Sequence, residues 1–375
     1  MRTRSLTVDA FKAIAAQLIV LHHFAAYSPM ADVLSMTWSG LINVLFEDAR
    51  MVVQVFLVTS GYLVARSFAR QEKISPLPLI VRRYFRLLPS YFIALVITVL
   101  AAWLMRSHIE GAAAALGLES WLPAEPSWVK FFGHLLMVQN VLQIDALTVG
   151  VWYVAIDLQL FMATVFLIWL ANTLRGKYYL AGHLTLISLL STASLWFFNL
   201  NPDWDDYAVY FYGAYGLGML AFWSTQQPRA LKVFVFTLAM AVGAFIYAPR
   251  ARVAIAIATA LSLYLATKLN PSGSLKARSK YLHLLSDSSY ALFLNHFAVL
   301  IVLSGVWYKY ALQSELSAWI FIALGWSISF VFSLLVYKYL ERPLVTWLAN
   351  AFDRVWARKP LAALDPKTGS SASKY

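Results

Sequence analysis

The chain consists mainly of long apolar stretches separated by short polar segments, many of them basic. A helix needs about 20 apolar residues to cross the roughly 30 Å of hydrocarbon in a bilayer. A shorter apolar piece at 131–142 is more typical of a re-entrant or interfacial segment. The pattern predicts an all-α fold, a polytopic transmembrane helical bundle of about ten spans, at 8–28, 51–68, 87–106, 150–170, 180–198, 208–224, 232–248, 252–268, 288–308 and 318–340.

Composition supports a membrane protein. Of 375 residues, 61% are hydrophobic and 13% are charged, whereas soluble domains carry about 25% charged residues. The chain has no cysteine, which excludes disulfides, thiolate catalysis and cysteine-ligated metal. We predict one integral-membrane domain at 1–345 and a cytoplasmic, partly disordered tail at 346–375, because its last residues are polar.

The distribution of charge predicts the orientation. The net charge of +12 could indicate a nucleic-acid partner, but basic loops on the cytoplasmic face of a membrane explain it better, and no nucleic acid is expected. With ten spans, one face holds both termini and most of the basic residues. Both termini are therefore predicted to be cytoplasmic. Only six of the 30 basic residues fall on the other face: Arg50, Arg106, Lys130, Arg250, Arg252 and Lys309.

The first predicted span carries ionisable side chains on one face. Lys12 and His23 are eleven residues apart, which brings them back to nearly the same side of a helix. Asp9 lies one turn before Lys12. Ionisable groups within a span usually face the protein interior or a wet cavity. Interfacial anchoring of Asp9 and Lys12, with His23 as a buried structural residue, is the alternative.

The predicted topology also suggests a partner for His23. His23 lies about 22 Å from the inner end of its span, and Asp157 lies about 10 Å from the outer end of another. At similar depths the two could meet, and a carboxylate would orient the imidazole as a general base. A structural ion pair between two spans is equally compatible with this pattern.

Other polar positions have both a chemical and a structural interpretation. Ser60, in a patch of small residues, has no base nearby in sequence, so helix packing is the more frequent explanation. Arg82 and Arg86 share a helix face and could hold phosphates, although cytoplasmic charge is expected there anyway. His296, placed near the inner half of its span, could be a second polar site or a packing residue.

The predicted outer loops combine carboxylates with aromatic residues. Such pairs suit sugar binding, but Trp and Tyr also gather at any membrane interface. One such loop runs from 199 to 207. The longest, at about 107–149, carries Glu110, Glu119, Glu125, Asp145, Trp121 and Trp128.

Six segments together resemble the membrane-bound acyltransferase-3 family of sugar O-acyltransferases, in the family's order over residues 9–343. The family's first span has an arginine, ten residues and a histidine, where this chain has Lys12 and His23. The other matches are Val55-Phe56-Leu57-Val58-Thr59-Ser60-Gly61-Tyr62, Arg82-Arg83-Tyr84-Phe85-Arg86-Leu87-Leu88-Pro89, Trp152-Tyr153-Val154-Ala155-Ile156-Asp157, Ser289-Tyr290-Ala291-Leu292-Phe293-Leu294-Asn295-His296 and Glu341-Arg342-Pro343.

Two matches depart from the family pattern. Lys12 stands where the family has arginine, which keeps the charge but loses bidentate recognition. Asp157 stands where the family has glutamate and is one methylene shorter.

The resemblance implies a multi-pass enzyme of the bacterial inner membrane. It would transfer an acyl group, most commonly acetyl, from cytoplasmic acyl-CoA to a hydroxyl of an extracytoplasmic or lipid-linked glycan. His23 would be general base or transient acyl carrier, with Asp157 orienting it. Lys12, Arg82, Arg83 and Arg86 would contact the donor, and Ser60, Tyr62, Trp152 and His296 the substrates. Membrane lipid, acyl-CoA and the acceptor are the expected partners, with no bound cofactor or metal.

Two other classes of function remain open from the residues alone. Ionisable residues within spans serve transport as readily as catalysis, so a transporter or flippase of a lipid-linked glycan is the main alternative. A non-catalytic assembly partner is another. Transport does not require the spacing of Lys12 and His23 or the arginine cluster, and the chain shows no internal repeat of the kind that many transporters have.

Overall fold

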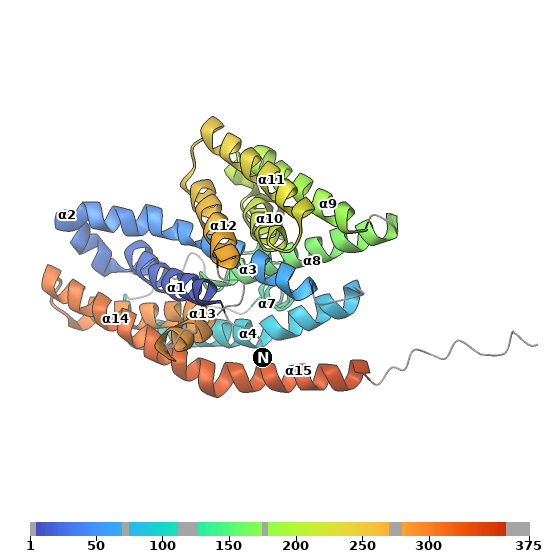
Figure 1. Ribbon diagram of the computed structural model, residues 1–375. Helices are drawn as coiled ribbons and strands as arrows, with labels where there is room; N and C mark the ends of the chain where they lie inside the picture. Colours follow the sequence, from blue (N-terminus) through green and yellow to red (C-terminus); the bar gives the residue numbers. More distant parts are fainter. Residues whose placement is uncertain (1–4, 70–74, 112–126, 175–178, 270–279, 358–375) are drawn as a thin grey trace, which may run out of the picture.

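The computed structural model describes residues 5–69, 75–111, 127–174, 179–269 and 280–357, and within them it contains helices and turns but no strand (Figure 1). The all-α prediction is confirmed for this part of the chain. By length and composition, seven helices in it could cross a membrane, at Leu6–Tyr27, Pro76–His108, Val151–Thr173, Pro228–Tyr247, Ala251–Leu269, Lys280–Tyr310 and Glu315–Phe352. The chain is thus a multi-pass membrane protein, while the count of ten and the side of the termini remain predictions.

The other three predicted spans coincide with shorter helices. They are α3 (Val53–Phe68), α9 (Tyr179–Ala193, continued by η3 at Ser194–Phe198) and α10 (Ala208–Ser224). From Tyr210 to Ser224 every residue of α10 is buried. This burial explains why α10 is apolar on all sides.

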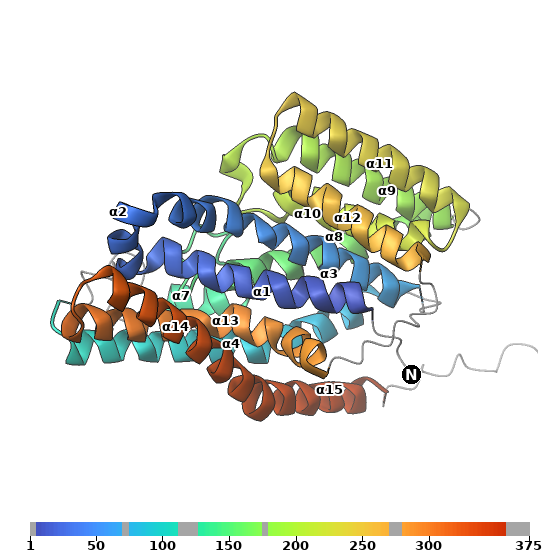
Figure 2. The ribbon, with the colours of Figure 1, turned by 60° about the vertical axis from the view of Figure 1, so that its left-hand side comes forward.

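The helices form two groups joined by α3. In Figure 2, α9–α12 form the group at the upper right, while α1, α2, α4, α13 and α14 form the group to the left of and below it. Helix α3 packs against α10 in one group and α1 in the other. The bounds of the remaining helices are α1 (Leu6–Tyr27), α2 (Pro29–Asn43), α4 (Pro76–His108), α8 (Val151–Leu174), α11 (Pro228–Tyr247), α12 (Ala251–Leu269), α13 (Lys280–Tyr310) and α14 (Glu315–Val336).

Glycines explain the close approach of α3 and α10. A Cβ added at Gly61 would overlap the backbone carbonyl of Tyr215, and one added at Gly218 would overlap that of Val58. The two backbones therefore touch where each helix lacks a side chain. The interpretation of the small-residue patch in span two as a packing surface is confirmed at Gly61. This contact holds the neighbouring Ser60 in a fixed place.

The short apolar piece after α4 turns back into the bundle. It forms α7 (Trp128–Leu135) followed by turns up to Gly150. The Leu135 carbonyl accepts a hydrogen bond of 2.7 Å from the Tyr84 hydroxyl, which lies only about 12 Å from the N-terminal end of α4. Helix α8 therefore starts deep among the other helices. The sequence pattern predicted a re-entrant or interfacial segment here, and the Tyr84 contact matches the re-entrant alternative.

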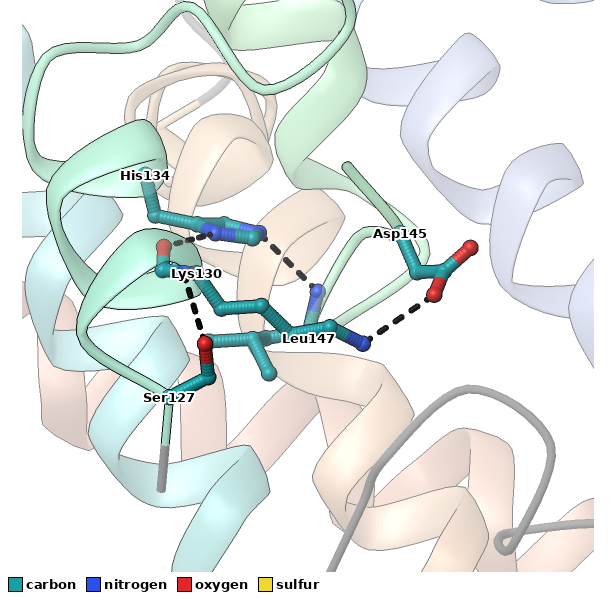
Figure 3. Close-up of polar contacts among 5 residues, drawn as sticks. All are labelled: Ser127, Lys130, His134, Asp145 and Leu147. Atoms are coloured by element: carbon teal, nitrogen blue, oxygen red, sulfur yellow. Dashed lines mark hydrogen bonds and ion pairs between the residues drawn. The ribbon is translucent and has the colours of Figure 1, made fainter. Parts of the chain in front are cut away.

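His134 holds the two arms of this re-entrant segment together (Figure 3). Its Nδ1 donates to the Lys130 carbonyl at 2.7 Å, and its Nε2 accepts from the Leu147 amide at 3.0 Å. An ion pair of 3.1 Å between Lys130 and Asp145 closes the same loop. Because Nε2 is an acceptor, the imidazole must be neutral. Burial also lowers the pKa of His134, which lies outside the seven long apolar helices.

We expect the loop that carries Leu147 to loosen in acid. A free imidazole takes up a proton near pH 6.5, whereas the closed loop disfavours the protonated ring. The closed form is therefore fully stable above this pH and loses stability as the pH falls below it. Hydrogen exchange at Leu147, corrected for the intrinsic effect of pH, should be faster at pH 5.5 than at pH 7.5. In His134→Ala it should be fast at both pH values; equal protection of the wild-type loop at both would contradict this role.

The part of the predicted tail that is described is helical. After η5 (Tyr337–Glu341), helix α15 runs from Arg342 to Ala357, so the predicted domain boundary at residue 345 falls within one helix. Its hydrophobic and polar residues segregate to opposite faces, as in a helix that packs on one side. Residues 358–375, which include the stretch expected to be disordered, lie outside the described residues.

Candidate active site

A cavity of about 490 Å³ opens where α1, α3, α4, α8 and α13 meet η5 and α15. We call it the basic cavity. Its basic lining residues are Lys12, Arg83, Arg86 and Arg342, and further inside lie Ser60, Asp157, Phe56, Tyr153 and Phe293. The Lys12 ammonium also donates a 3.0 Å hydrogen bond to the Ser286 carbonyl, which ties α1 to α13. Asp157, Asp287 and Glu341 line it as well, so the cavity combines a small excess of basic side chains with aromatic rings.

A buried ion pair forms one wall of the basic cavity. The Arg83 guanidinium lies 2.5 Å from one Asp157 oxygen, and the Ser60 hydroxyl donates to the other at 2.5 Å. Arg83 also lies over the Phe161 ring, 5.1 Å from its centroid. These contacts join α3, α4 and α8 at one point. Both carboxylate oxygens are occupied, so the geometry presents Asp157 as a structural anchor within the cavity wall.

The predicted pairing of His23 with Asp157 is wrong. Asp157 meets Arg83, which lies only about 10 Å from the N-terminal end of α4, rather than His23. The physical reason is the re-entrant segment: because α7 and the following turns enter the bundle, α8 starts deep among the helices, and Asp157 lies level with the N-terminal part of α4. The depth estimate had assumed that α8 starts at the membrane boundary.

The partner of His23 is another histidine. His23 Nδ1 lies 2.5 Å from His296 Nε2, with the two rings parallel within 4°. His296 Nδ1 lies 2.9 Å from the Leu292 carbonyl. His296 lies in the middle of α13, about 24 Å from its N-terminal end, while its depth in the membrane stays a prediction. Both imidazoles are buried.

The hydrogen bonds fix which nitrogen of His23 is free. A carbonyl can only accept, so His296 Nδ1 carries the proton and its Nε2 is an acceptor. His23 Nδ1 must then donate to His296, which leaves the lone pair of His23 on Nε2. His296 thereby orients the imidazole of His23, which is the role that a carboxylate was expected to have. An imidazole held in this tautomer has an unprotonated nitrogen ready to take a proton.

His23 faces a second cavity of about 630 Å³, which we call the histidine cavity. Phe293 lines both this cavity and the basic cavity. His22 lines it too, but its Nδ1 lies 3.0 Å from the Leu45 carbonyl and so holds the chain between α2 and α3. The full lining is Ile19, His22, His23, Ala26, Tyr27, Phe46, Arg50, Val53, Ala146, Val149, Trp152 and Phe293.

A third cavity, of about 390 Å³, adjoins the histidine cavity, and Ala146 and Trp152 line both. We call it the acidic cavity, and it is lined by Gln139, Asn140, Gln143, Ile144, Asp145, Ala146, Trp152, Asp205, Asp206 and Phe211. The Asn140 side-chain oxygen is buried with no hydrogen-bond partner among the described residues. Burial, together with the neighbouring Asp206, raises the pKa of Asp205. Carboxylates, amides and aromatic rings therefore share one hollow.

A buried histidine with a free nitrogen thus lies between a basic cavity and an acidic one, inside a bundle of apolar helices. A family model described as an acyltransferase domain matches residues 6–338. The chain belongs to the acyltransferase-3 family. It is therefore an acyl-transferring enzyme of the membrane. A search of curated proteins and a search of solved structures returned no significant match.

The structure of this acyltransferase separates the predicted site residues. Lys12, Arg83, Arg86, Ser60 and Asp157 line the basic cavity, and His23 and Trp152 line the histidine cavity. His296 is hydrogen-bonded to His23. Glu119, Glu125 and Trp121, which were expected in an outer loop with a possible sugar contact, lie outside the described residues.

Two predicted site residues lie elsewhere. Arg82 is exposed and is absent from the lining of all three cavities, because the cavity side of α4 carries Arg83 and Arg86 instead. The Tyr62 hydroxyl forms a 2.7 Å hydrogen bond with Thr267, and its ring packs against Phe222. Tyr62 therefore joins α3 to α12 and lines none of the three cavities.

Sequence reasoning missed the aromatic residues between the cavities and the amides of the acidic cavity. Phe293 stands in the matched segment before His296, and the three-residue spacing places the two on one face of α13. That spacing was the available signal. Gln139, Asn140 and Gln143 gave none, because they come together only through the turns after α7, where Met137 and Gln143 have positive φ.

Proposed function

We propose that this enzyme is an O-acyltransferase of the bacterial inner membrane, moving an acyl group, most commonly acetyl, from acyl-CoA to a hydroxyl of a glycan or glycolipid. The observation that carries the proposal is the position of His23, which keeps a free nitrogen and lines a cavity that adjoins both the basic and the acidic cavity. A donor and an acceptor can thus approach the same base from opposite sides.

The basic cavity suits the donor. Acyl-CoA carries phosphates at one end and the thioester at the end of a narrow pantetheine arm. Arg86 and Lys12 could contact phosphate oxygens, for which guanidinium and ammonium groups are suited. The apolar, aromatic inner end of this cavity leads toward His23 and suits the uncharged arm. The predicted cytoplasmic orientation would place this cavity on the side where acyl-CoA is made.

The acidic cavity suits the acceptor. Sugars present many hydroxyl groups and apolar ring faces, and they need hydrogen-bond donors, acceptors and aromatic surfaces. Gln139, Gln143 and the aspartates supply the first two, and Trp152 and Phe211 supply the third. Trp152 also lines the histidine cavity, so a sugar against its ring would have a hydroxyl directed toward His23.

In the proposed reaction, His23 Nε2 accepts the proton of the acceptor hydroxyl as the oxygen attacks the thioester carbonyl carbon. A carbon–oxygen bond forms, the carbon–sulfur bond breaks, and the thiolate of coenzyme A leaves and takes up the proton. His296 keeps the proton of His23 on Nδ1, so that Nε2 is free to act. Asp157 takes no part in the proton transfer and holds Arg83 in the cavity wall.

We expect Arg86→Gln to raise the KM for acetyl-CoA about tenfold, because one charge-assisted hydrogen bond is worth about 1.5 kcal/mol or more. Arg82→Gln is the matched control: it lies one turn away on α4, outside the cavity, and should change little. The donor affinity of the wild type should fall as salt is added, and less steeply in Arg86→Gln. Reconstituted protein with labelled acetyl-CoA provides the measurement. If Arg86→Gln and Arg82→Gln behave alike, the donor site does not involve Arg86.

A further inference from the structure

Three aromatic rings in mutual contact lie where the basic cavity adjoins the histidine cavity. Phe56 on α3, Tyr153 on α8 and Phe293 on α13 contact one another in all three pairs. The ring centroids lie 5.5 Å apart for Phe56 and Phe293, 5.2 Å for Tyr153 and Phe293, and 6.0 Å for Phe56 and Tyr153. All three line the basic cavity, but only Phe293 also lines the histidine cavity.

Phe293 is the ring that stands between the two. Its side chain is 3% exposed, and the re-entrant segment packs against it: a Cβ added at Gly150 would lie 2.9 Å from the Phe293 carbonyl and 3.4 Å from its ring. His296 lies one turn further along α13 and is hydrogen-bonded to His23. Whatever travels from the basic cavity to His23 therefore has to pass Phe293.

We propose that the three rings of Phe56, Tyr153 and Phe293 form a closed partition between the donor and acceptor sides, and that Phe293 sets the width of the acyl group that can be transferred. This inference rests on the proposed function, since it needs a donor in the basic cavity. The acyl group precedes the pantetheine arm through the partition. Because that arm is itself a long, narrow chain, the opening selects by width rather than by length.

The partition also explains how the basic cavity and the histidine cavity can lie next to each other without a water path between them. Rings in mutual contact exclude water when no donor is present, and displacement of one ring by an entering chain opens the way. A linear acetyl group needs the smallest displacement, whereas a branched or aromatic acyl group needs more.

A variant of Phe293 and a control variant test whether Phe293 sets the width of the acyl group that can be transferred. Phe293→Ala should raise the rate with benzoyl-CoA relative to acetyl-CoA at least tenfold. Phe234→Ala is the matched control, because Phe234 is equally buried, at 2% exposure, but lies on α11 and lines none of the three cavities; its ratio should stay that of the wild type. If Phe293→Ala does not fold, Phe293→Leu replaces it, with a smaller increase expected. A folded Phe293 variant that keeps the wild-type ratio overturns the proposal.

A second measurement needs no enzymatic activity. The chain has no cysteine, so a single cysteine can be labelled selectively. Ser67→Cys would report on the basic cavity and Ala26→Cys on the histidine cavity. In vesicles, a charged, membrane-impermeant thiol reagent is added on the side from which Ser67→Cys reacts. From that side Ala26→Cys should react at least tenfold faster with Phe293→Ala than without it, while Ser67→Cys is unchanged.

The two measurements separate the failure of this inference from that of the proposed function. Fast labelling of Ala26→Cys from the basic side in otherwise wild-type protein would show that no partition exists, whatever the activity. An enzyme that uses no acyl-CoA would overturn the proposed function and with it the assignment of width, while the labelling would still test the barrier itself.

Discussion

Replacing His23 with alanine is expected to lower acyl transfer by about 10²–10⁴-fold, the usual worth of a positioned general base. The side chain is buried and lines the histidine cavity, and its Nε2 carries the free lone pair. Turnover should be measured in membranes that contain equal amounts of wild-type and variant protein. The KM for acyl-CoA should change little, because His23 is absent from the lining of the basic cavity.

Neighbouring histidines supply the controls for this prediction. His22→Ala removes a hydrogen bond to the Leu45 carbonyl and should have a mild effect on turnover. His296→Leu should lower turnover nearly as far as His23→Ala, because His23 Nδ1 then has no acceptor. His296→Gln should recover part of the loss, since its amide oxygen can accept that proton. Near-normal transfer by His23→Ala would remove His23 from the chemistry.

The second large effect concerns the folded state rather than the reaction. Removing one member of the buried pair formed by Arg83 and Asp157 should cost about 3–5 kcal/mol, because the other charge is left buried without a partner. The side chains of Arg83 and Asp157 are 18% and 6% exposed, so little water can replace the lost contact. Thermal unfolding of the detergent-solubilised single variants Arg83→Met and Asp157→Leu should show a clear loss of stability.

The double variant distinguishes a structural pair from a catalytic one. Arg83→Met with Asp157→Leu leaves no unpaired charge and should be more stable than either single variant. Acyl transfer per folded molecule should fall less in these variants than in His23→Ala. If the single variants unfold like the wild type yet transfer no acyl group, the pair acts in the reaction and not as an anchor.

Much of the architecture could be predicted from local patterns. A run of about 20 apolar residues has few alternatives to a membrane-spanning helix, because backbone groups in lipid must be paired within the segment. This argument predicted the helices that carry the site, while the shortness of the apolar piece at 131–142 left a re-entrant or an interfacial segment open. It was weakest at α10, where burial on all sides gives no periodic pattern. Spacing along a helix was equally reliable, and it placed His23 facing the interior.

The sequence by itself determined the helical fold, the family and the residue types of the site; the tertiary structure decided which residues meet. His23 and His296 are 273 residues apart, and no spacing rule predicts a contact over that distance. The re-entrant segment lowers the start of α8 into the bundle, and so Asp157 pairs with Arg83 instead of His23. Phe293 acquires its place between two cavities only when α3, α8 and α13 come together. Local patterns fix direction and periodicity along one helix, whereas depth and partners depend on how all the helices pack.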